Sequence, residues 1–346
     1  MVTILRYRQV AGEAIAAVAA ATLLVWSFGA SAQAANFHPC NAQPALPICQ
    51  HGYGKRVAVK RWGAQPAPLD PDAAANASLL TRDPAGEIRK LRSSTVFVVD
   101  MDTSDVLFAR NEGTVRPIAS ITKLMTGLVV VKAGLPMDEM IRIDASDTGV
   151  PSELPSRLSA GEKWSRADLL HVALTASENS AAHALGRTYP GGMKAFVDAM
   201  NAEAHLLGMD DSRFVDPVGL SNENVSSARD LSKLVQAASL QPMIRQFTTD
   251  ADYEAAGQTF NNTNLLVGRP QWDILASKTG TTREAGDCLV MMIRWSGRRL
   301  AMVLLNAQGM SGARFGDAVR TLRIVKSQAQ GQTAGPMLAD QAGKSP

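Results

Sequence analysis

The chain has 346 residues, 46% of them hydrophobic, and a formal net charge of +3 at pH 7. This charge is small, and no basic cluster interleaved with aromatic residues occurs, which argues against a nucleic-acid-binding protein. The length suffices for one large domain or two smaller ones with a substantial hydrophobic core.

The N-terminal segment 1–34 is typical of a secretory signal peptide. Arg6 and Arg8 precede an apolar run over 14–28, and the small-x-small pattern at 32–34 predicts cleavage directly after it. An uncleaved membrane anchor is the alternative, which the alanine-rich run disfavours. No later run is long and apolar enough to span a membrane. We therefore expect a periplasmic protein with no stable membrane anchor after cleavage.

Two further segments are predicted to lie outside the main domain. Residues 35–90 are rich in Ala, Pro and Asn without a hydrophobic period, which predicts an arm or linker, and 331–346 form a polar tail. Cys40 and Cys49 are close together in this exported arm, so a local disulfide is plausible. Cys288 lies in the apolar run DCLVMMI and is expected to be a buried thiol.

The domain is expected to occupy 91–330, and its pattern changes twice along the chain. Two β-rich runs flank the turn sequence DMDTSD, helical patterns follow, and three β-rich runs then form a meander before a last helix. The predicted helices start near Pro117 and span 165–176, 191–208, 227–240 and 312–327, and the predicted meander strands are ILASKTG, AGDCLVMMIRW and RRLAMVLLNAQ. Ser165 and Ser227 each open a helix in a capping pattern.

Strands at both ends of the domain, with helices between them, predict one sheet built from chain-distant pieces. We expect an α/β (α+β) sandwich: an antiparallel sheet of about five strands, flanked by helices, with an inserted helical subdomain. The order of elements does not fit a βαβ repeat.

The sequence RPIASITKLMTG contains the first candidate for chemistry. Ser120 and Lys123 are three residues apart, so on a helix they share one face and the amine can reach the hydroxyl. A serine that opens a helix with a lysine one turn later is also an ordinary surface feature. This motif alone therefore does not decide between the two readings.

Other catalytic devices have little support. There is no H-E-x-x-H, G-x-S-x-G, G-x-G-x-x-G or P-loop sequence, so we expect neither a metal nor a cofactor. His171 and His183 lie in helical sequence and are expected to be ordinary core or surface histidines. Cys288 has no neighbouring base that would make it a nucleophile.

Two further short motifs accompany Ser120 and Lys123. The sequence SEN covers 177–179 at the end of an apolar helix, and KTG covers 278–280 at the end of a predicted strand. S-x-x-K, S-x-N and K-T-G in this order resemble the penicillin-recognising serine DD-peptidases, which include the class A β-lactamases. The stretches IASITKLMT, SENSAAHALGRTYPGG, FVDPVGLSNENVSSARDL and ASKTGTTREAGDCLVMM resemble the low-molecular-mass penicillin-binding proteins of the D-alanyl-D-alanine endopeptidase type.

The resemblance implies a β-lactamase/transpeptidase-like fold and a role for each motif residue. Ser120 would be the nucleophile, Lys123 its base, Ser177 a proton relay to the leaving amine, and Asn179 a partner of Lys123 and the substrate amide. An ordinary lysine has a pKa of about 10.4, so a neutral base at pH 7 requires a shift of roughly three units. Like-charge repulsion from Lys278, together with burial, is the expected cause.

The resemblance also assigns the substrate-binding strand. Lys278, Thr279, Gly280 and Thr281 would align the substrate along the strand edge and bind its carboxylate, and the backbone N–H groups of Ser120 and Thr281 would form the oxyanion hole. Glu178 within SEN and the threonines after KTG differ from the residues that relatives can carry at these positions. We expect these differences to affect substrate specificity and not the reaction.

The implied activity is hydrolysis of D-alanyl bonds in peptidoglycan stem peptides through an acyl-enzyme, with β-lactam antibiotics as inhibitors. The longer stretches favour an endopeptidase, and a carboxypeptidase is the alternative. A β-lactamase would need a glutamate for deacylation, and no E-x-x-L-N sequence lies between Asn179 and Lys278. A silent cell-wall-binding module would have no use for an activated nucleophile.

Overall fold

The computed structural model describes residues 83–150, 155–309 and 312–330. The predicted signal peptide, the Cys40–Cys49 disulfide, nearly all of the 35–90 arm and the 331–346 tail lie outside these residues.

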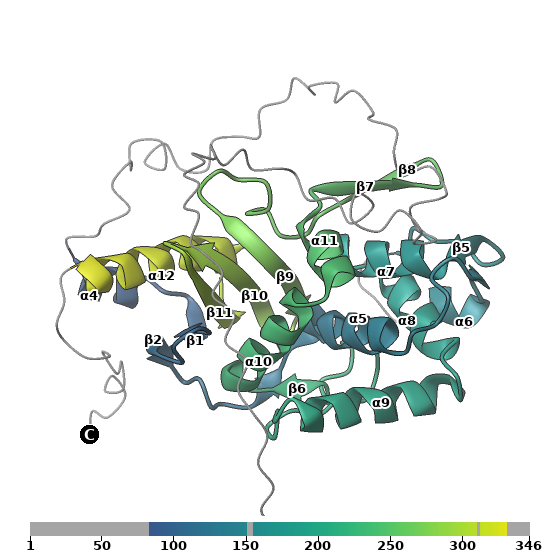
Figure 1. Cartoon of the computed structure of the whole chain (residues 1–346), viewed down its shortest axis with the longest axis horizontal. Helices are drawn as coiled ribbons and strands as arrows, with labels where there is room; N and C mark the ends of the chain where they lie inside the picture. Colours follow the sequence, from purple (N-terminus) through teal and green to yellow (C-terminus); the bar gives the residue numbers. More distant parts are fainter. Residues whose placement is uncertain (1–82, 151–154, 310–311, 331–346) are drawn as a thin grey trace, which may run out of the picture.

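A five-stranded antiparallel sheet forms the centre of the domain, in the order β2-β1-β11-β10-β9 (Figure 1). Its strands are β1 Ser93–Asp100, β2 Val106–Arg110, β9 Asp273–Thr282, β10 Gly286–Trp295 and β11 Arg298–Ala307. Ser93 pairs with Ala307, so the N-terminal hairpin joins the C-terminal meander in one sheet. The predicted sheet of about five antiparallel strands is confirmed.

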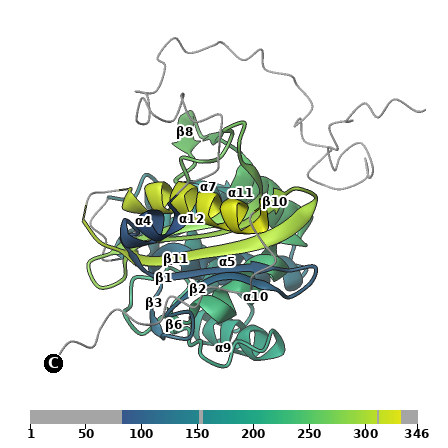
Figure 2. The same ribbon diagram turned by 90° about the vertical axis from the view of Figure 1, so that its left-hand side faces the viewer.

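Both faces of the sheet are buried, because the strands carry apolar side chains on both sides. Val96, Val98 and Met302 point into a core with helix α12, Ala313–Gln330, whereas Phe97 and Val303 point into a larger core with the helical subdomain. Figure 2 shows α12 on one face, with α5 and α10 on the other.

Helix α4, Pro84–Arg89, packs on α12 and belongs to the folded unit (Figure 2). It lies within the segment expected to be an arm, so the folded unit begins ahead of residue 91. Asp83 caps the helix by accepting a hydrogen bond from the N–H of Gly86, and proline occupies the first turn. A six-residue helix has no extended periodic pattern in the sequence, which explains the difference.

The inserted subdomain lies between β2 and β9 and is mainly helical, as predicted. Its helices are η1 Ala119–Ile121, α5 Thr122–Lys132, α6 Ala145–Thr148, α7 Arg166–Thr175, α8 Asn179–Arg187, α9 Gly192–Leu206, α10 Ala228–Ser239 and α11 Pro242–Thr249. Three two-stranded ribbons complete it: β3 Arg116–Pro117 with β6 Val225–Ser226, β4 Met140–Arg142 with β5 Lys163–Ser165, and β7 Asp252–Ala255 with β8 Gln258–Asn261.

The predicted capping serines are confirmed. Ser165 Oγ accepts from the N–H of Asp168 at 3.0 Å, and Ser227 Oγ accepts from the N–H of Asp230 at 3.2 Å. Cys288 is a buried free thiol, and burial raises its pKa to about 11. Within the part of the chain that the structure describes, no helix is long and apolar enough to cross a membrane.

Candidate active site

Ser120 lies at the point where the chain turns from ribbon β3 into helix α5. The turn is a 3₁₀ helix, η1, instead of the first turn of an α-helix, and the preceding Ala119 has a left-handed φ of 48°. A Cβ on Gly219 would lie 2.0 Å from the carbonyl oxygen of Ala119, and one on Gly280 would lie 3.0 Å from the nitrogen of Ser120. Two glycines thus allow the backbone to pack closely around this strained turn.

Lys123 lies one turn after Ser120 and is fully buried. Its Nζ is 2.8 Å from Ser120 Oγ, 2.8 Å from Asn179 Oδ1 and 2.9 Å from the carbonyl oxygen of Val218. A neutral amine has two N–H donors and one lone pair. The two N–H groups match Asn179 and Val218, which leaves the lone pair for the hydroxyl proton of Ser120. In the charged form the ammonium would instead donate to all three oxygens, so it is the neutral form of Lys123 that can act as a base toward Ser120.

The charge state of Lys123 agrees with this geometry. Burial lowers its pKa to about 7, against the opposing effect of the carboxylates of Asp216 and Glu178. The like-charge repulsion expected from Lys278 is not among the causes. The repulsion instead affects Lys278. Burial lowers the pKa of Lys278 most, and the charges of Lys123 and Arg314 lower it further, well below its usual range.

The carbonyl of Val218 is positioned by a loop whose function was not predicted from the sequence. The carboxylate of Asp216 accepts from the N–H groups of Val218 at 2.7 Å, Gly219 at 2.6 Å and Ser221 at 3.1 Å. Buried Asn224 fixes the start of the loop, because its Oδ1 accepts from the N–H of Val215 at 2.6 Å. The loop therefore presents a fixed acceptor to Lys123.

The SEN motif lies between helices α7 and α8. Ser177 has a left-handed φ of 61°, and Asn179 begins α8, which brings its amide to Lys123. Glu178 is buried on the other side, where Ser156 Oγ donates to it at 3.0 Å and Arg157 forms an ion pair at 3.5 Å. The left-handed backbone at Ser177 thus directs the serine and the paired glutamate to different partners along the cleft.

Strand β9 carries the KTG motif along the opposite side. Lys278 is only 1% exposed, and its Nζ donates to the carbonyl of Thr279 at 3.1 Å. Thr281 Oγ1 accepts from Arg314 at 2.6 Å and donates to Asp287 at 2.9 Å. Arg314 lies on α12, far from the motifs in sequence, so no local signal pointed to it.

A cleft of about 1320 Å³ runs between β9 and the helical subdomain. Its wall includes six of the predicted site residues: Ser120, Ser177, Asn179, Thr279, Gly280 and Thr281. Lys123 and Lys278 are buried behind this wall. The structure therefore brings the three motifs together around one cleft, with the two lysines below its surface.

Comparison with known proteins identifies relatives of the whole domain. A family model described as D-alanyl-D-alanine carboxypeptidase, Peptidase S11, matches residues 81–309. A D-alanyl-D-alanine endopeptidase of Escherichia coli is 43% identical over 73% of this chain and 82% of its own length. A D-alanyl-D-alanine endopeptidase of Pseudomonas aeruginosa is 44% identical over 69% of this chain and 79% of its own length.

Solved structures with the same fold include penicillin-binding enzymes. The Streptomyces K15 DD-transpeptidase is 25% identical, with a TM-score of 0.64 over 69% of this chain and 98% of that one. Penicillin-binding protein D2 of Listeria monocytogenes in its cefotaxime-bound form is 30% identical, with a TM-score of 0.60 over 68% of this chain and 98% of that one. These similarities agree with the fold expected from the sequence.

Proposed function

The chain belongs to the Peptidase S11 family, and from this premise we propose that it is a serine DD-peptidase that cleaves D-alanyl cross-links in peptidoglycan. The observation that carries the proposal is the set of contacts of Lys123, a buried amine with a pKa of about 7 that lies 2.8 Å from Ser120 Oγ and can accept its proton when neutral.

The first half of the reaction forms an acyl-enzyme. Ser120 Oγ attacks the carbonyl carbon of the scissile D-alanine while Lys123 accepts the hydroxyl proton. The backbone N–H groups of Ser120 and Thr281 stabilise the oxyanion. As the C–N bond breaks, the leaving amine takes a proton from Lys123 through Ser177. The acyl group then remains on Ser120 as an ester.

The second half regenerates the enzyme. A water molecule gives a proton to Lys123 and attacks the ester carbonyl, and Ser120 leaves with the proton returned to it. Thr279 and Thr281 on the cleft wall would bind the substrate's carboxylate. Lys278 lies beneath the wall of the cleft. In its charged form it would therefore contribute a positive electrostatic potential at the cleft surface.

An endopeptidase and a carboxypeptidase of this type differ only in the amine that leaves the D-alanyl carbonyl. The two relatives at 43% and 44% identity are named endopeptidases, a third endopeptidase is at 32%, and relatives named carboxypeptidases are at 28–32%. The same serine chemistry serves both reactions, and the difference lies in the amine that the cleft admits. Greater similarity to the endopeptidases therefore favours cleavage of the bond from D-alanine to a cross-bridging diamino acid.

We expect purified enzyme to convert cross-linked muropeptide dimers to monomers, and a Ser120→Ala variant to leave them intact. Chromatography with mass spectrometry of the digested fragments measures this. Release of free D-alanine from pentapeptides with dimers untouched would identify a carboxypeptidase instead.

Inhibition by β-lactams and export are parts of the same proposal. The Listeria relative has been solved with cefotaxime and with ampicillin bound, which supports acylation of Ser120 by these compounds. A periplasmic location rests on the signal-peptide pattern of residues 1–34 and on the cell-wall substrate.

A further inference from the structure

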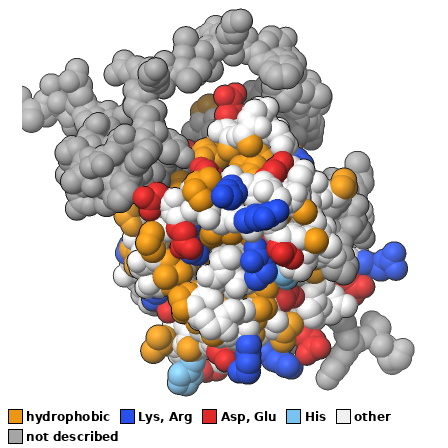
Figure 3. All heavy atoms as spheres, turned by 90° about the vertical axis from the view of Figure 1, so that its right-hand side faces the viewer, with side chains coloured by type: hydrophobic (Ala, Val, Ile, Leu, Met, Phe, Trp, Pro, Cys, Tyr) orange, Lys and Arg blue, Asp and Glu red, His pale blue; other side chains and the backbone are white. Residues whose placement is uncertain are grey.

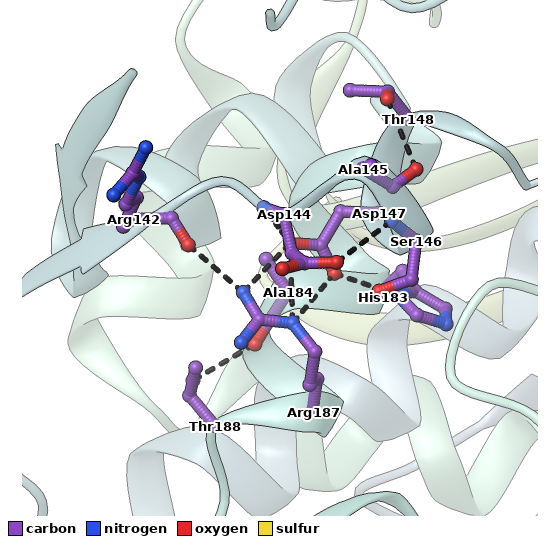
Figure 4. A network of polar contacts seen from close by, with 10 residues as sticks. All are labelled: Arg142, Asp144, Ala145, Ser146, Asp147, Thr148, His183, Ala184, Arg187 and Thr188. Atoms are coloured by element: carbon purple, nitrogen blue, oxygen red, sulfur yellow. Dashed lines mark hydrogen bonds and ion pairs between the residues drawn. The ribbon is translucent and has the colours of Figure 1, made fainter. Parts of the chain in front are cut away.

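A second polar centre lies beside the catalytic residues, where helices α6 and α8 meet. Figure 4 shows Asp147 of α6 between Arg187 and His183, both from α8. Asp147 is fully buried, and its Oδ1 lies 2.7 Å from Nδ1 of His183. His183 is one helical turn after Asn179 and lines the cleft. His183 is thus a hydrogen-bonded, partly exposed histidine, and its place in the cleft was not predicted from the sequence.

The partners of Asp147 fix the proton on His183. Burial raises the pKa of Asp147, but the hydrogen bonds from His183 and Arg187 outweigh this effect and lower it to about 2. An ionised carboxylate can only accept hydrogen bonds, so Nδ1 of His183 must carry a proton. In the neutral ring Nε2 is then an acceptor, with the ring orientation set by Asp147.

Asp147 also has partners other than His183, although the hydrogen bond from His183 contributes most to lowering its pKa. Arg187 donates to it through Nε at 2.9 Å and through a terminal nitrogen at 2.7 Å, and the N–H of Asp144 donates at 2.8 Å. The His183 side chain remains 23% exposed, and Nε2 has no hydrogen-bond partner among the residues that the structure describes. The contact with Asp147 therefore serves to orient a cleft-lining imidazole.

The acceptor at Nε2 of His183 favours one class of ligand group. Asp216 also lines the cleft, but its carboxylate accepts three backbone N–H groups of its own loop. With Nδ1 protonated, a neutral His183 matches an N–H donor better than it matches a carboxylate. Peptide amides of a stem peptide supply such donors, whereas the small ring system of a β-lactam supplies few.

We propose that His183 is a specificity-determining residue whose Nε2 accepts a hydrogen bond from an N–H group of the stem peptide, outside the scissile bond. Asp147 is its positioning residue. This inference rests on the proposed DD-peptidase activity and adds a substrate contact to it.

Two substitutions of His183 separate the ligand contact from the structural one. Asparagine places a polar group near the position of Nδ1 and has nothing at Nε2, whereas glutamine places one near Nε2. We expect His183→Asn to lower kcat/KM for muropeptide dimers about tenfold, as for one lost hydrogen bond, and His183→Gln to retain most of it. The second-order rate of acylation by benzylpenicillin should change less than about twofold in both.

Arg187→Gln is the matched control, because it removes one partner of Asp147 while the hydrogen bond between His183 and Asp147 can remain in place. It should lower the melting temperature while leaving the ratio of muropeptide to penicillin reactivity unchanged. An unchanged ratio in His183→Asn would overturn the inference and leave only a structural role. If the wild-type enzyme cleaved pentapeptides but not dimers, the proposed endopeptidase activity would be wrong without affecting the inference about His183. The ratio of peptide to penicillin reactivity would then be measured with pentapeptides.

Discussion

Replacing Lys123 with alanine is expected to slow acylation of Ser120 by about 10³- to 10⁴-fold, because it removes the only amine in contact with the hydroxyl among the described residues. In the wild type, kcat/KM should rise with pH up to about 7 and then level off. The sign follows from the pKa of Lys123: the neutral amine is the active form and predominates above about 7. Stopped-flow acylation by a chromogenic β-lactam between pH 5 and 9 measures both effects.

Lys132→Ala provides the control, since Lys132 is on the same helix but forms an ion pair with Glu203 instead. It should react at nearly the wild-type rate, as expected for loss of a partly exposed ion pair. Wild-type acylation that stayed constant from pH 5 to 9 would contradict the assignment of Lys123 as the base.

Replacing Gly280 with alanine is expected to lower acylation about 10²-fold or more. A Cβ at this position would lie 2.9 Å from the carbonyl oxygen of Ile118 and 3.0 Å from the nitrogen of Ser120, so β9 must move away from η1. The N–H groups of Ser120 and Thr281 would then no longer converge on one oxyanion, and loss of one such donor costs 10²- to 10³-fold. Acylation kinetics, with circular dichroism to verify folding, measure the effect.

Gly113→Ala is the matched glycine control, because no atom lies within 4 Å of the Cβ that it would add. Its acylation rate should equal that of the wild type. Equal rates in Gly280→Ala and Gly113→Ala would show that the close packing of β9 on η1 does not support the reaction.

Regular elements with strong apolar patterns could be predicted from the sequence. Strands β10 and β11 contain long apolar runs bounded by turn residues, β9 begins with the short apolar run ILA, and α10 begins after a serine cap. Helix α8 was expected around His183 but without bounds, because its buried residues are mostly small: Ala181, Ala182, Ala184 and Gly186. Gly186 needs to be small, since a Cβ there would lie 3.0 Å from Pro217.

The proximity of the three motifs could also be predicted, but not the contacts that surround them. The spacing of Ser120 and Lys123 indicated their hydrogen bond, whereas the carbonyl of Val218 and the paired Arg314 depend on tertiary structure. The pKa of Lys123 follows from burial, which no local pattern encodes. The pairing of His183 with Asp147 was not predicted, because Asp147 is 36 residues away on a helix of only four residues.

The face of the molecule at the right of Figure 1 is drawn in Figure 3, where basic and acidic side chains are interspersed. Neither positive nor negative charge dominates this face. We therefore do not expect it to attract a strongly charged polymer over a long range. Recognition of the substrate is therefore expected to depend on the cleft residues more than on the charge of this face.

The most direct test of the central assignment is to locate the covalent adduct formed with benzylpenicillin. Intact-mass measurement followed by peptide mapping should find one adduct per chain, on the peptide containing Ser120, and none in Ser120→Ala. The adduct should outlast a turnover time of about one second, which is slow for an enzyme acting on its own substrate. An adduct on another residue, or hydrolysis of penicillin faster than about one per second, would contradict the account.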